Sequence, residues 1–439
     1  MRQLNRTAVP LLAVTLVLAA CGAGGRDEDD GDGSSTPQPG VTDDSVTVGA
    51  HFPLTGVAAP GYSEIPTGAQ AYFDFVNAAG GVHGREIEYV VKDDAYNPTN
   101  TSKVTNELVL QDEIFAMVGG LGTPTHSAVV DFLNDEGVPD LFVSSGSLQW
   151  GDDVEAAPYT FGWQPDYEIE GKIIGQYVAE NLPDAKVGLF LQDDDFGEDA
   201  EKGVRQYVDD QIVGVERYTS GNTDVGPQVA GLQAAGADLV LAFDTPSYTA
   251  LSQLTALKLG YEPQWFYSNV GSDPRLVGGL LSEFSEGAVE PGANALDGVL
   301  STEYIPGVDA PDDAWVQLWQ RVWDEHGGDG ELTNYRIYGM SHAYAFVQAL
   351  QAAGEDLTRD GLVEALEGLG DQPGPQLAPF RYSADSHLGI SGLRVVELRG
   401  GVGEPKTPVL VSDIGDAEIS EDSSDQAEDA PPESGVPSD

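Results

Sequence analysis

Two short segments rich in glycine and hydroxyl side chains have the composition of loops that hold a small anion. Residues 119–125 read GGLGTPT, and residues 144–147 read SSGS. Glycine lets the backbone approach a ligand closely, and hydroxyl groups donate hydrogen bonds to a carboxylate. A helix that begins near Thr125 would add positive potential at its N-terminus. The two segments therefore suit one small carboxylate, although turns and helix caps use the same residue types, and both interpretations stay open.

Each segment directly follows an apolar run that predicts a buried strand. Such runs alternate along the chain with amphipathic stretches, which is typical of parallel sheets covered by helices. We expect strands at 46–50, 87–91, 115–118, 141–143, 187–191, 239–243 and 265–267, and helices at 68–79, 101–111, 127–134, 169–180, 200–208, 250–259, 313–325, 338–352 and 361–369. Ligands of open parallel sheets bind beyond the carboxyl ends of the strands, so the two segments should form one cradle there.

Three interruptions of this alternation predict crossings between two lobes. Residues 158–165 carry alternating aromatic side chains, residues 296–304 form a second break, and strands near 380–382 and 393–398 would return the chain a third time. The predicted fold is therefore α/β, with two doubly wound parallel-sheet lobes joined by a three-stranded hinge. The predicted lobes comprise 45–163 plus 300–378 for lobe 1, and 164–299 plus 379–410 for lobe 2.

The N-terminus has the features of a bacterial export signal. Arg2 and Arg6 precede an uncharged stretch at 8–20, which is too short to span a bilayer but suits a signal peptide. The stretch ends in LAAC at Cys21, which resembles the lipobox of bacterial lipoproteins and implies a diacylglycerol on the thiol. An ordinary secretory signal with an incidental cysteine is the alternative. We expect a lipoprotein signal peptide at 1–20 and a disordered acidic tether at 21–44.

The charge balance excludes several classes of partner. The chain has 20 Lys+Arg against 73 Asp+Glu, a formal net charge of −53. Nucleic-acid recognition needs clustered cations, and an anionic membrane surface would repel such a chain. The single cysteine excludes a disulfide framework and a Cys-based zinc site. Since no Lys or Arg follows Lys406, we expect a disordered acidic tail at 411–439.

An ordered series of motifs resembles the branched-chain amino-acid-binding (leucine-binding) family. The motifs are FPLTG at 52–56, NAAGGVHGR at 77–85, DDA at 93–95 followed by NP at 97–98, GVP at 137–139, DDFG at 194–197 and LQAAGAD at 232–238. These are the type I periplasmic solute-binding proteins of ABC transporters, and the resemblance runs from about residue 45 to about 400. It implies a type I periplasmic binding protein fold, a ligand closed between two lobes, and delivery to a membrane permease.

The resemblance also implies ligand residues. By alignment, Thr123 and Ser147 supply hydroxyls to a ligand carboxylate and Ser145 supplies backbone contacts. Phe196 stands where the family commonly places an aromatic residue, and Thr245 takes another contact position. The expected ligand-binding set is Thr123, Thr125, Ser145, Ser147, Phe196 and Thr245. His126, next to the first segment, is expected as a capping or surface residue rather than a ligand contact.

One family feature is missing from the sequence. Amino-acid binders use a carboxylate after the strand at 265–267 to hold the ligand ammonium, but this chain has Ser268, Asn269 and Val270 there. A buried ammonium needs a charged or strongly polar partner, and Asp244 or Asp273 would have to substitute. The sequence therefore predicts that deaminated or aromatic carboxylates compete well against α-amino acids.

No motif of an enzyme stands out. The 119–125 segment has no Walker A lysine, no Gly-x-Ser-x-Gly or His-Glu-x-x-His occurs, and the six histidines show no metal-ligand spacing. We therefore expect no catalysis, no cofactor and no metal. The predicted function is that of a monomeric, extracytoplasmic, lipid-anchored protein that delivers a small carboxylate, such as an amino acid or an aromatic or aliphatic acid, to an ABC importer by lobe closure. A ligand-sensing receptor ectodomain of the same fold is the main alternative, and a secreted hydrolase is the second.

Overall fold

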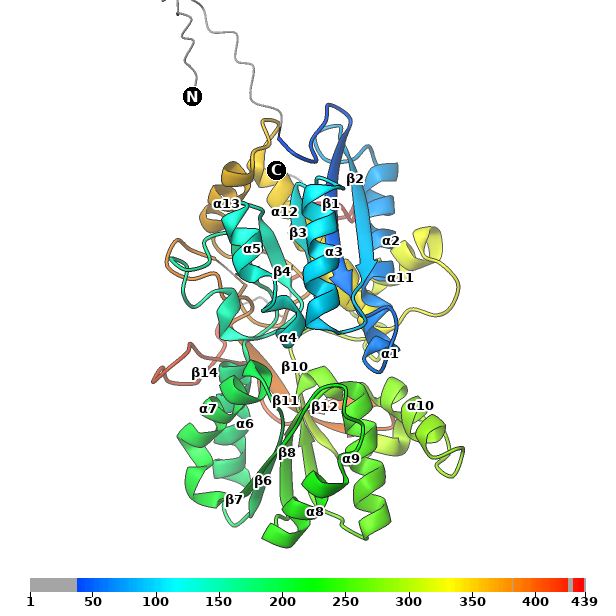
Figure 1. Cartoon of the computed structure of the whole chain (residues 1–439), viewed down its shortest axis with the longest axis vertical. Coiled ribbons are helices and arrows are strands. Elements are labelled where there is room, and N and C mark those ends of the chain that lie inside the picture. Colours follow the sequence, from blue (N-terminus) through cyan, green and yellow to red (C-terminus); the bar gives the residue numbers. More distant parts are fainter. Residues whose placement is uncertain (1–37, 381, 425–428, 438–439) are drawn as a thin grey trace, which may run out of the picture. The chain divides into compact units, whose positions relative to one another are not determined.

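The computed structural model describes residues 38–380, 382–424 and 429–437, which form two β-sheets covered by helices (Figure 1). The predicted signal peptide at 1–20, Cys21 and most of the tether at 21–44 lie outside the described residues. The α/β architecture with two lobes is confirmed, because each sheet has its own helices. Within the described part of the chain, no helix has the length and apolar character needed to cross a membrane.

The first sheet has five strands in the order β2-β1-β3-β4-β5, all parallel. They are β1 (Ser45–Phe52), β2 (Glu86–Asp93), β3 (Ala116–Val118), β4 (Asp140–Val143) and β5 (Thr160–Gly162). Its helices are α1 (Ala59–Tyr62), α2 (Ile65–Ala78), α3 (Pro98–Leu110), α4 (Thr123–His126), α5 (Val130–Asp135), α11 (Ala314–His326), α12 (Asn334–Ala353) and α13 (Arg359–Gly368). Because β3 and β4 are parallel neighbours, the segments that follow them emerge at the same edge of the sheet.

The second sheet has nine strands in the order β14-β13-β11-β10-β9-β8-β6-β7, with β12 paired to β11. They are β6 (Val187–Gln192), β7 (Ile212–Tyr218), β8 (Leu239–Phe243), β9 (Gln264–Tyr267), β10 (Leu300–Glu303), β11 (Gly392–Arg399), β12 (Val402–Pro405), β13 (Leu410–Val411) and β14 (Ser420–Glu421). The strands from β7 to β10 are parallel, and β11 runs antiparallel to β10. The sheet is thus parallel only in part, because the last strands return as hairpins.

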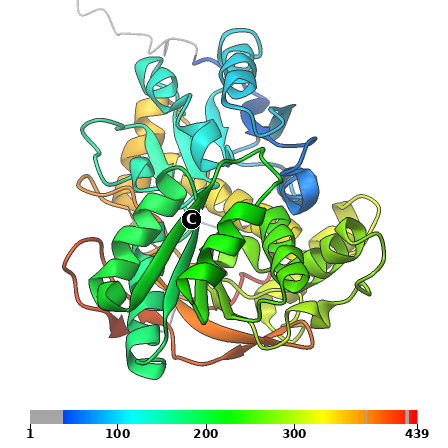
Figure 2. The same cartoon turned by 60° about the horizontal axis from the view of Figure 1, so that its bottom comes forward.

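Helices cover both faces of the second sheet, as Figures 1 and 2 show. They are α6 (Tyr167–Asn181), α7 (Asp195–Val208), α8 (Gly226–Ala235), α9 (Pro246–Leu259) and α10 (Pro274–Phe284). Alternate residues of β6 show the division: Val187, Leu189 and Leu191 pack in one cluster with α6 and α7, whereas Phe190 packs in another with α8, α9 and α10. A strand that is apolar on both faces is what a parallel sheet between two helix layers requires.

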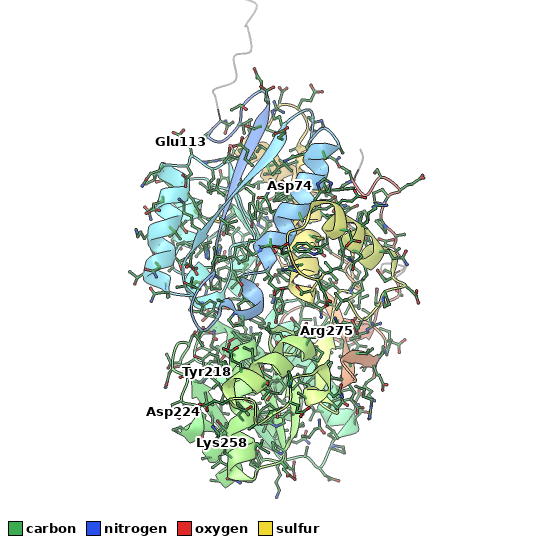
Figure 3. All side chains as sticks on the ribbon, turned by 90° about the vertical axis from the view of Figure 1, so that its right-hand side faces the viewer. Asp74, Glu113, Tyr218, Asp224, Lys258 and Arg275 are labelled. Carbon is green, nitrogen blue, oxygen red and sulfur yellow. The ribbon has the colours of Figure 1, made fainter. Side chains whose placement is uncertain are left out.

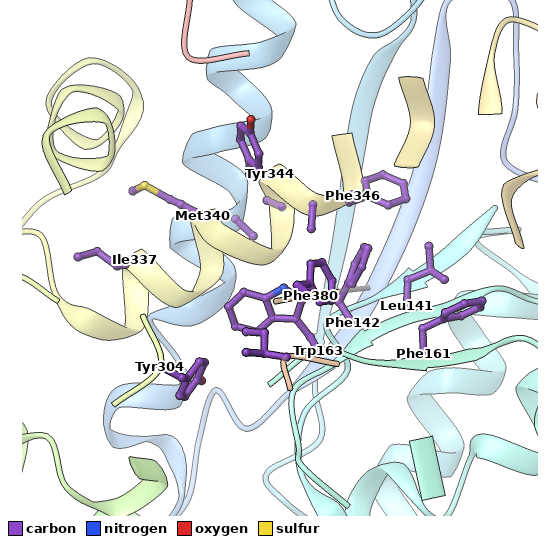
Figure 4. Close-up of a cluster of buried hydrophobic side chains, with 14 of the residues drawn as sticks. Leu141, Phe142, Phe161, Trp163, Tyr304, Ile337, Met340, Tyr344, Phe346 and Phe380 are labelled. Carbon is purple, nitrogen blue, oxygen red and sulfur yellow. The ribbon is translucent and has the colours of Figure 1, made fainter. Parts of the chain in front are cut away.

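The main core of the first sheet lies between its strands and α12. Figure 4 shows Leu141, Phe142 and Phe161 of the strands together with Tyr344 and Phe346 of α12. All five side chains are at most 3% exposed. The predicted helix at 338–352 falls within α12, which is buried almost all round because it packs against other helices as well as the sheet.

The chain passes between the elements of the two sheets three times, after β5, after β10 and after α13. The second passage differs from the predicted boundary, since residues 300–303 form β10 in the second sheet whereas the sequence places them in lobe 1. The third passage runs through Phe380 and Tyr382, which still pack against Phe142 of the first sheet. The prediction missed the sheet pairing of 300–303, because four residues without apolar alternation carry little strand signal.

The C-terminal residues, predicted to be a disordered tail at 411–439, are ordered over most of their length. β13 pairs with β11, and β14 pairs with β13. The ammonium of Lys172, fully buried on α6, donates to the backbone carbonyls of Asp413, Gly415 and Ala417 at 2.6, 3.0 and 2.7 Å. The acidic side chains stay exposed while the backbone makes the contacts, so the acidic composition alone was a misleading guide.

A second part of this C-terminal segment contacts helices of the first sheet. The indole Nε1 of Trp315 on α11 donates to the carbonyl of Asp429 at 3.0 Å, and the Tyr72 hydroxyl on α2 donates to the carbonyl of Gly435 at 2.9 Å. The described C-terminal residues therefore reach from α6 of the second sheet to α2 and α11 of the first.

Candidate functional site

A cavity of about 200 Å³ lies between elements of the two sheets. From the first sheet it is lined by Tyr62, Tyr96, Gly122, Thr123, Ser144, Tyr335 and Tyr338, and from the second by Phe196, Thr245, Asn269, Val270, Ser272, Asp273, Thr302 and Tyr304. None of the described residues that line it is a lysine, an arginine or a histidine. Carboxyl groups come from Asp273, Glu303 and Asp309. The cavity is therefore aromatic, hydroxyl-rich and acidic.

The two predicted loops lie against each other at the edge of the first sheet. The N–H of Gly122 donates to the carbonyl of Ser144 at 3.2 Å, and the N–H of Ser144 donates to the carbonyl of Gly120 at 2.9 Å. Gly119 and Gly122 have φ angles of 79° and 101°, which residues with a side chain rarely adopt. Glycine is thus required for the loop shape, and the parallel order of β3 and β4 brings the two loops together.

Some predicted ligand residues reach the cavity and others do not. Those that line it are Thr123, Phe196 and Thr245. The hydroxyl of Thr125 instead donates to the carbonyl of Leu121 at 2.5 Å. The hydroxyl of Ser147 accepts the N–H of Gln149 at 3.3 Å and caps the short 3₁₀ helix η1 (Leu148–Trp150). Capping, which the sequence left open as the alternative, is what the structure shows for Ser147.

The hydroxyl groups of Ser145 and Thr123 form a pair, and the phenol of Tyr167 lies next to it. The two side-chain oxygens are 2.8 Å apart, and the phenol oxygen of Tyr167 is 3.5 Å from Ser145 Oγ. Burial raises the pKa of Tyr167 to about 12, so its phenol stays protonated and can donate. Sequence reasoning missed Tyr167, although Asp166 before it is a recognisable N-cap whose carboxylate accepts the N–H of Ile169 at 2.8 Å.

Further phenols surround the cavity, and sequence reasoning missed those on α12. Tyr338 donates its hydroxyl to Gln164 Oε1 at 3.0 Å. Tyr62 and Tyr335 meet edge to face, with ring centroids 5.9 Å apart. Burial raises the pKa of Tyr62 and of Tyr335 well above the ordinary value, so the phenols are neutral. Tyr335 and Tyr338 occupy positions on α12 that read as ordinary core positions at helical spacing, which hid their role as wall residues.

Four buried polar side chains form a chain of contacts behind the first loop. His51 Nδ1 lies 2.8 Å from Asp94 Oδ2, His51 Nε2 lies 2.9 Å from His126 Nδ1, and His126 Nε2 lies 2.7 Å from Asp140 Oδ2. All four are 0% exposed. His126 is therefore an internal residue, which corrects its predicted capping or surface role. The partners are distant in sequence, so spacing could not reveal them.

This His–Asp chain restricts its own protonation. The outer ring nitrogens face carboxyl groups, and the facing nitrogens of His51 and His126 leave room for only one hydrogen between them, so the tautomers of the two rings are coupled. Burial lowers the pKa of His51, although Asp94 opposes that effect. A Cβ at Gly120 would lie 2.7 Å from His126 Nδ1, so the loop passes directly over the paired rings. The chain thereby supports the loop that carries Thr123.

Hydrogen bonds join the two walls across the cavity. Ser247 Oγ on α9 donates to the carbonyl of Val57 at 2.7 Å, and Asn334 Nδ2 on α12 donates to Asp273 Oδ2 at 2.7 Å. Such bonds form only when the elements of the two sheets approach each other. The two walls are therefore in direct contact at these points.

Sequence comparison assigns this fold and cavity to a known group. The chain matches the family described as periplasmic binding protein over residues 45–402. The chain belongs to this family. The binding protein is 24% identical over 339 residues to an amino acid binding protein of Pseudomonas aeruginosa, an alignment that covers 67% of this chain and 89% of the relative. The predicted family relationship is confirmed.

Solved structures show the same fold. The fatty acid ABC transporter substrate-binding protein from Thermomonospora curvata superposes with a TM-score of 0.71 at 22% identity, covering 86% of this chain and 95% of the other. A branched chain amino acid ABC transporter protein from Thermus thermophilus with bound valine gives a TM-score of 0.69 at 20% identity, covering 84% and 96%. The binding protein therefore has a type I periplasmic binding protein fold. No group of three or more His, Cys, Asp or Glu side chains among its described residues could hold a metal ion.

The capping role of Ser147 leads to a first prediction. Ser147→Ala should lower the free energy of unfolding by about 0.5–2 kcal/mol, the usual cost of losing a cap, and leave ligand affinity unchanged. Thr123→Val should weaken ligand binding, because Thr123 lines the cavity, and should also cost about 1–3 kcal/mol of stability, because Ser145 Oγ loses its partner. Denaturant unfolding and calorimetry with leucine as the probe separate the two effects. Equal losses of affinity in both variants would show that Ser147 contributes to ligand binding after all.

Proposed function

We propose that this binding protein is extracytoplasmic, is anchored to the cell membrane through a lipid on Cys21, and delivers a small solute to an ABC importer. The observation that supports this most is the cavity, which receives side chains from both sheets. A solute that contacts both walls stabilises the closed arrangement, which a permease then recognises. The relatives from Thermomonospora curvata and Thermus thermophilus, described as parts of ABC transporters, support the same role. The proposal involves neither catalysis nor a cofactor.

A small carboxylate is the proposed solute. Thr123 and the phenols of Tyr167 and Tyr338 offer neutral hydroxyls at one end of the cavity, and a carboxylate accepts hydrogen bonds from such groups. The Pseudomonas aeruginosa relative is described as binding amino acids and the Thermomonospora curvata protein as serving fatty acids. Both ligand classes contain a carboxylate, which supports the proposal that the solute carries one.

Ligand-induced closure tests the proposal. Purified protein should be screened by thermal shift against amino acids, aromatic acids, amides and short peptides. A true ligand at a hundred times its Kd should stabilise the protein by about 2.7 kcal/mol. Small-angle scattering at saturation should then show a smaller radius of gyration. An unchanged scattering profile with a ligand that stabilises the protein would contradict closure.

Membrane attachment is tested separately. Cys21→Ser should release the protein from the membrane fraction, since Cys21 is the only cysteine and the only lipidation site proposed. Wild-type protein should stay with the membranes after a carbonate wash. A Cys21→Ser protein that also resists the wash would refute the lipid anchor and leave the solute-binding role untouched.

A further inference from the structure

A buried carboxylate lies directly behind the wall of the cavity where the sequence shows no acid. Glu170, on the first turn of α6, is 0% exposed. Its Oε1 accepts the backbone N–H and the side-chain amide of Asn269, each at 2.9 Å, and also the hydroxyl of Thr302. Asn269 and Thr302 both line the cavity. The acid missing after β9 therefore has a counterpart on a different element.

The contact with Glu170 determines which way the Asn269 amide is oriented. A carboxylate accepts hydrogen bonds, so the NH₂ group of Asn269 must face Glu170. The amide oxygen of Asn269 then does not face Glu170, and it accepts no hydrogen bond from the described residues. Since Asn269 lines the cavity, this oxygen is available as an acceptor for a ligand.

Among the described residues, the carboxyl group of Glu170 forms no ion pair with a lysine or an arginine. Its second oxygen, Oε2, is likewise buried without a hydrogen-bond partner in that part of the chain. The nearby Arg394 is paired with Glu303 at 3.0 Å, and Arg275 is exposed, at the boundary between the two sets of helices in Figure 3. Burial raises the pKa of Glu170, while Thr302, Asn269 and the side chain of Ser268 oppose that shift by hydrogen bonding. A buried charge of this kind favours the approach of a positive group.

We propose that Glu170 is a specificity-determining positioning residue that makes this cavity select solutes carrying an ammonium group. It acts in two ways: it orients the Asn269 oxygen as an acceptor, and its uncompensated charge makes the second-sheet wall negative. Asp273, which lines the same side of the cavity, adds to that potential. The acidic surface of the whole protein acts in the same direction, because a net charge of −53 favours cationic over anionic groups.

This proposal reverses the expectation that deaminated acids compete well. That expectation rested on the residues after β9 alone, whereas Glu170 precedes them in the chain by 99 positions. The inference rests on the proposed function, because it assigns a selectivity to the solute cavity. The carboxylate end of the solute would meet Thr123 and Tyr167, and the ammonium end would meet Asn269.

Calorimetry with matched pairs of compounds tests the role of Glu170. The probes are leucine with 4-methyl-2-oxopentanoate, and phenylalanine with phenylpyruvate, so each pair differs in the amino group. Of leucine and phenylalanine, the amino acid that the wild-type protein binds more tightly should have at least tenfold higher affinity than its own oxo analogue. Glu170→Gln should reduce that ratio at least tenfold, with little change for the oxo acid. Adding Asn269→Asp to Glu170→Gln should restore the ratio, because it moves the acid to the cavity wall.

The possible outcomes separate this proposal from the proposed function. Equal binding within each pair, or an equal loss for both members in Glu170→Gln, would overturn the role of Glu170 and leave the solute-binding function standing. Failure of all four compounds to bind the wild-type protein would contradict the carboxylate ligand and this inference together. Should Glu170→Gln not fold, Asn269→Ala provides the same test, since it removes the acceptor oxygen and leaves the buried acid in place.

Discussion

Replacing His126 with leucine is expected to lower the free energy of unfolding by about 3–5 kcal/mol, because it removes a hydrogen-bond partner from the buried Asp140 carboxyl group and from His51. His126 lies between Asp140 Oδ2 at 2.7 Å and His51 Nε2 at 2.9 Å, and none of these side chains is exposed. Leucine would leave the Asp140 carboxylate with only the hydroxyl of Thr160, 3.1 Å away, as a hydrogen-bond donor. Urea unfolding followed by circular dichroism measures the loss.

A matched control separates burial from the histidine itself. His326, in the last turn of α11, is only partly buried, so His326→Leu should change the free energy of unfolding by less than about 1 kcal/mol. Ligand binding should weaken in His126→Leu and persist in His326→Leu, because the paired rings of His51 and His126 support the loop of Thr123. A His126→Leu protein as stable as wild type would show that the buried chain carries no net stabilisation.

The same chain makes stability depend on pH. In the unfolded protein His51 has the ordinary histidine pKa of about 6.5, whereas burial lowers the pKa of His51 in the folded protein. Below pH ~6.5 the unfolded His51 therefore binds more protons than the native one, and its contribution to stability falls as pH falls, by at most about 1.4 kcal/mol per pH unit. Buried carboxyl groups such as Asp166 and Glu303, whose pKa burial raises to about 7, act in the opposite direction. The effect of His51 is therefore measured as a difference: between pH 7 and pH 5 the stability of the wild type should fall relative to that of His51→Leu.

The loops of the first wall were accessible to sequence reasoning because their signals are local. Glycines, hydroxyls and an apolar run lie within a few positions of each other, and the parallel order of the strands places the two loops at the same edge of the sheet. The loop that carries Thr123 could be located in that way, whereas Thr123 itself, Phe196 and Thr245 were named from the family resemblance. Strands β7 and β10 were not predicted from the sequence, because their residues are only partly apolar and their pairing is decided by neighbours far along the chain.

Glu170, behind the second-sheet wall, could not be predicted, since it comes from a segment that looks like a solvated helix. Glu168, Glu170 and Lys172 are polar residues at alternate positions of α6, yet all three are 0% exposed. Each is buried because a distant segment covers it: Asn269 contacts Glu170, and the C-terminal segment contacts Glu168 and Lys172. Long-range contacts of this kind leave no trace in composition or periodicity.

The second large effect concerns Lys172 and the C-terminal segment. Lys172→Met should lower the free energy of unfolding by about 2–4 kcal/mol, since hydrogen bonds to a charged group contribute about 1.5–3 kcal/mol each and methionine keeps the apolar stem. The ammonium of Lys172 donates to the carbonyls of Asp413, Gly415 and Ala417. Without it these carbonyls lose their donor, and the segment should detach from α6 and become more sensitive to protease.

Lys103 offers the matched control, because it is an exposed lysine on a different helix, α3. Its ammonium lies 3.7 Å from Glu107 Oε1 and its side chain is 74% exposed, and exposed ion pairs contribute about 0–1 kcal/mol. Lys103→Met removes the same charge and should change both unfolding and proteolysis little. Hydrogen exchange should show faster exchange of the Gly415 amide, which donates to Glu168 at 2.9 Å, in Lys172→Met alone. Equal effects of the two variants would mean that net charge, rather than the three carbonyl contacts of Lys172, holds the segment on the protein.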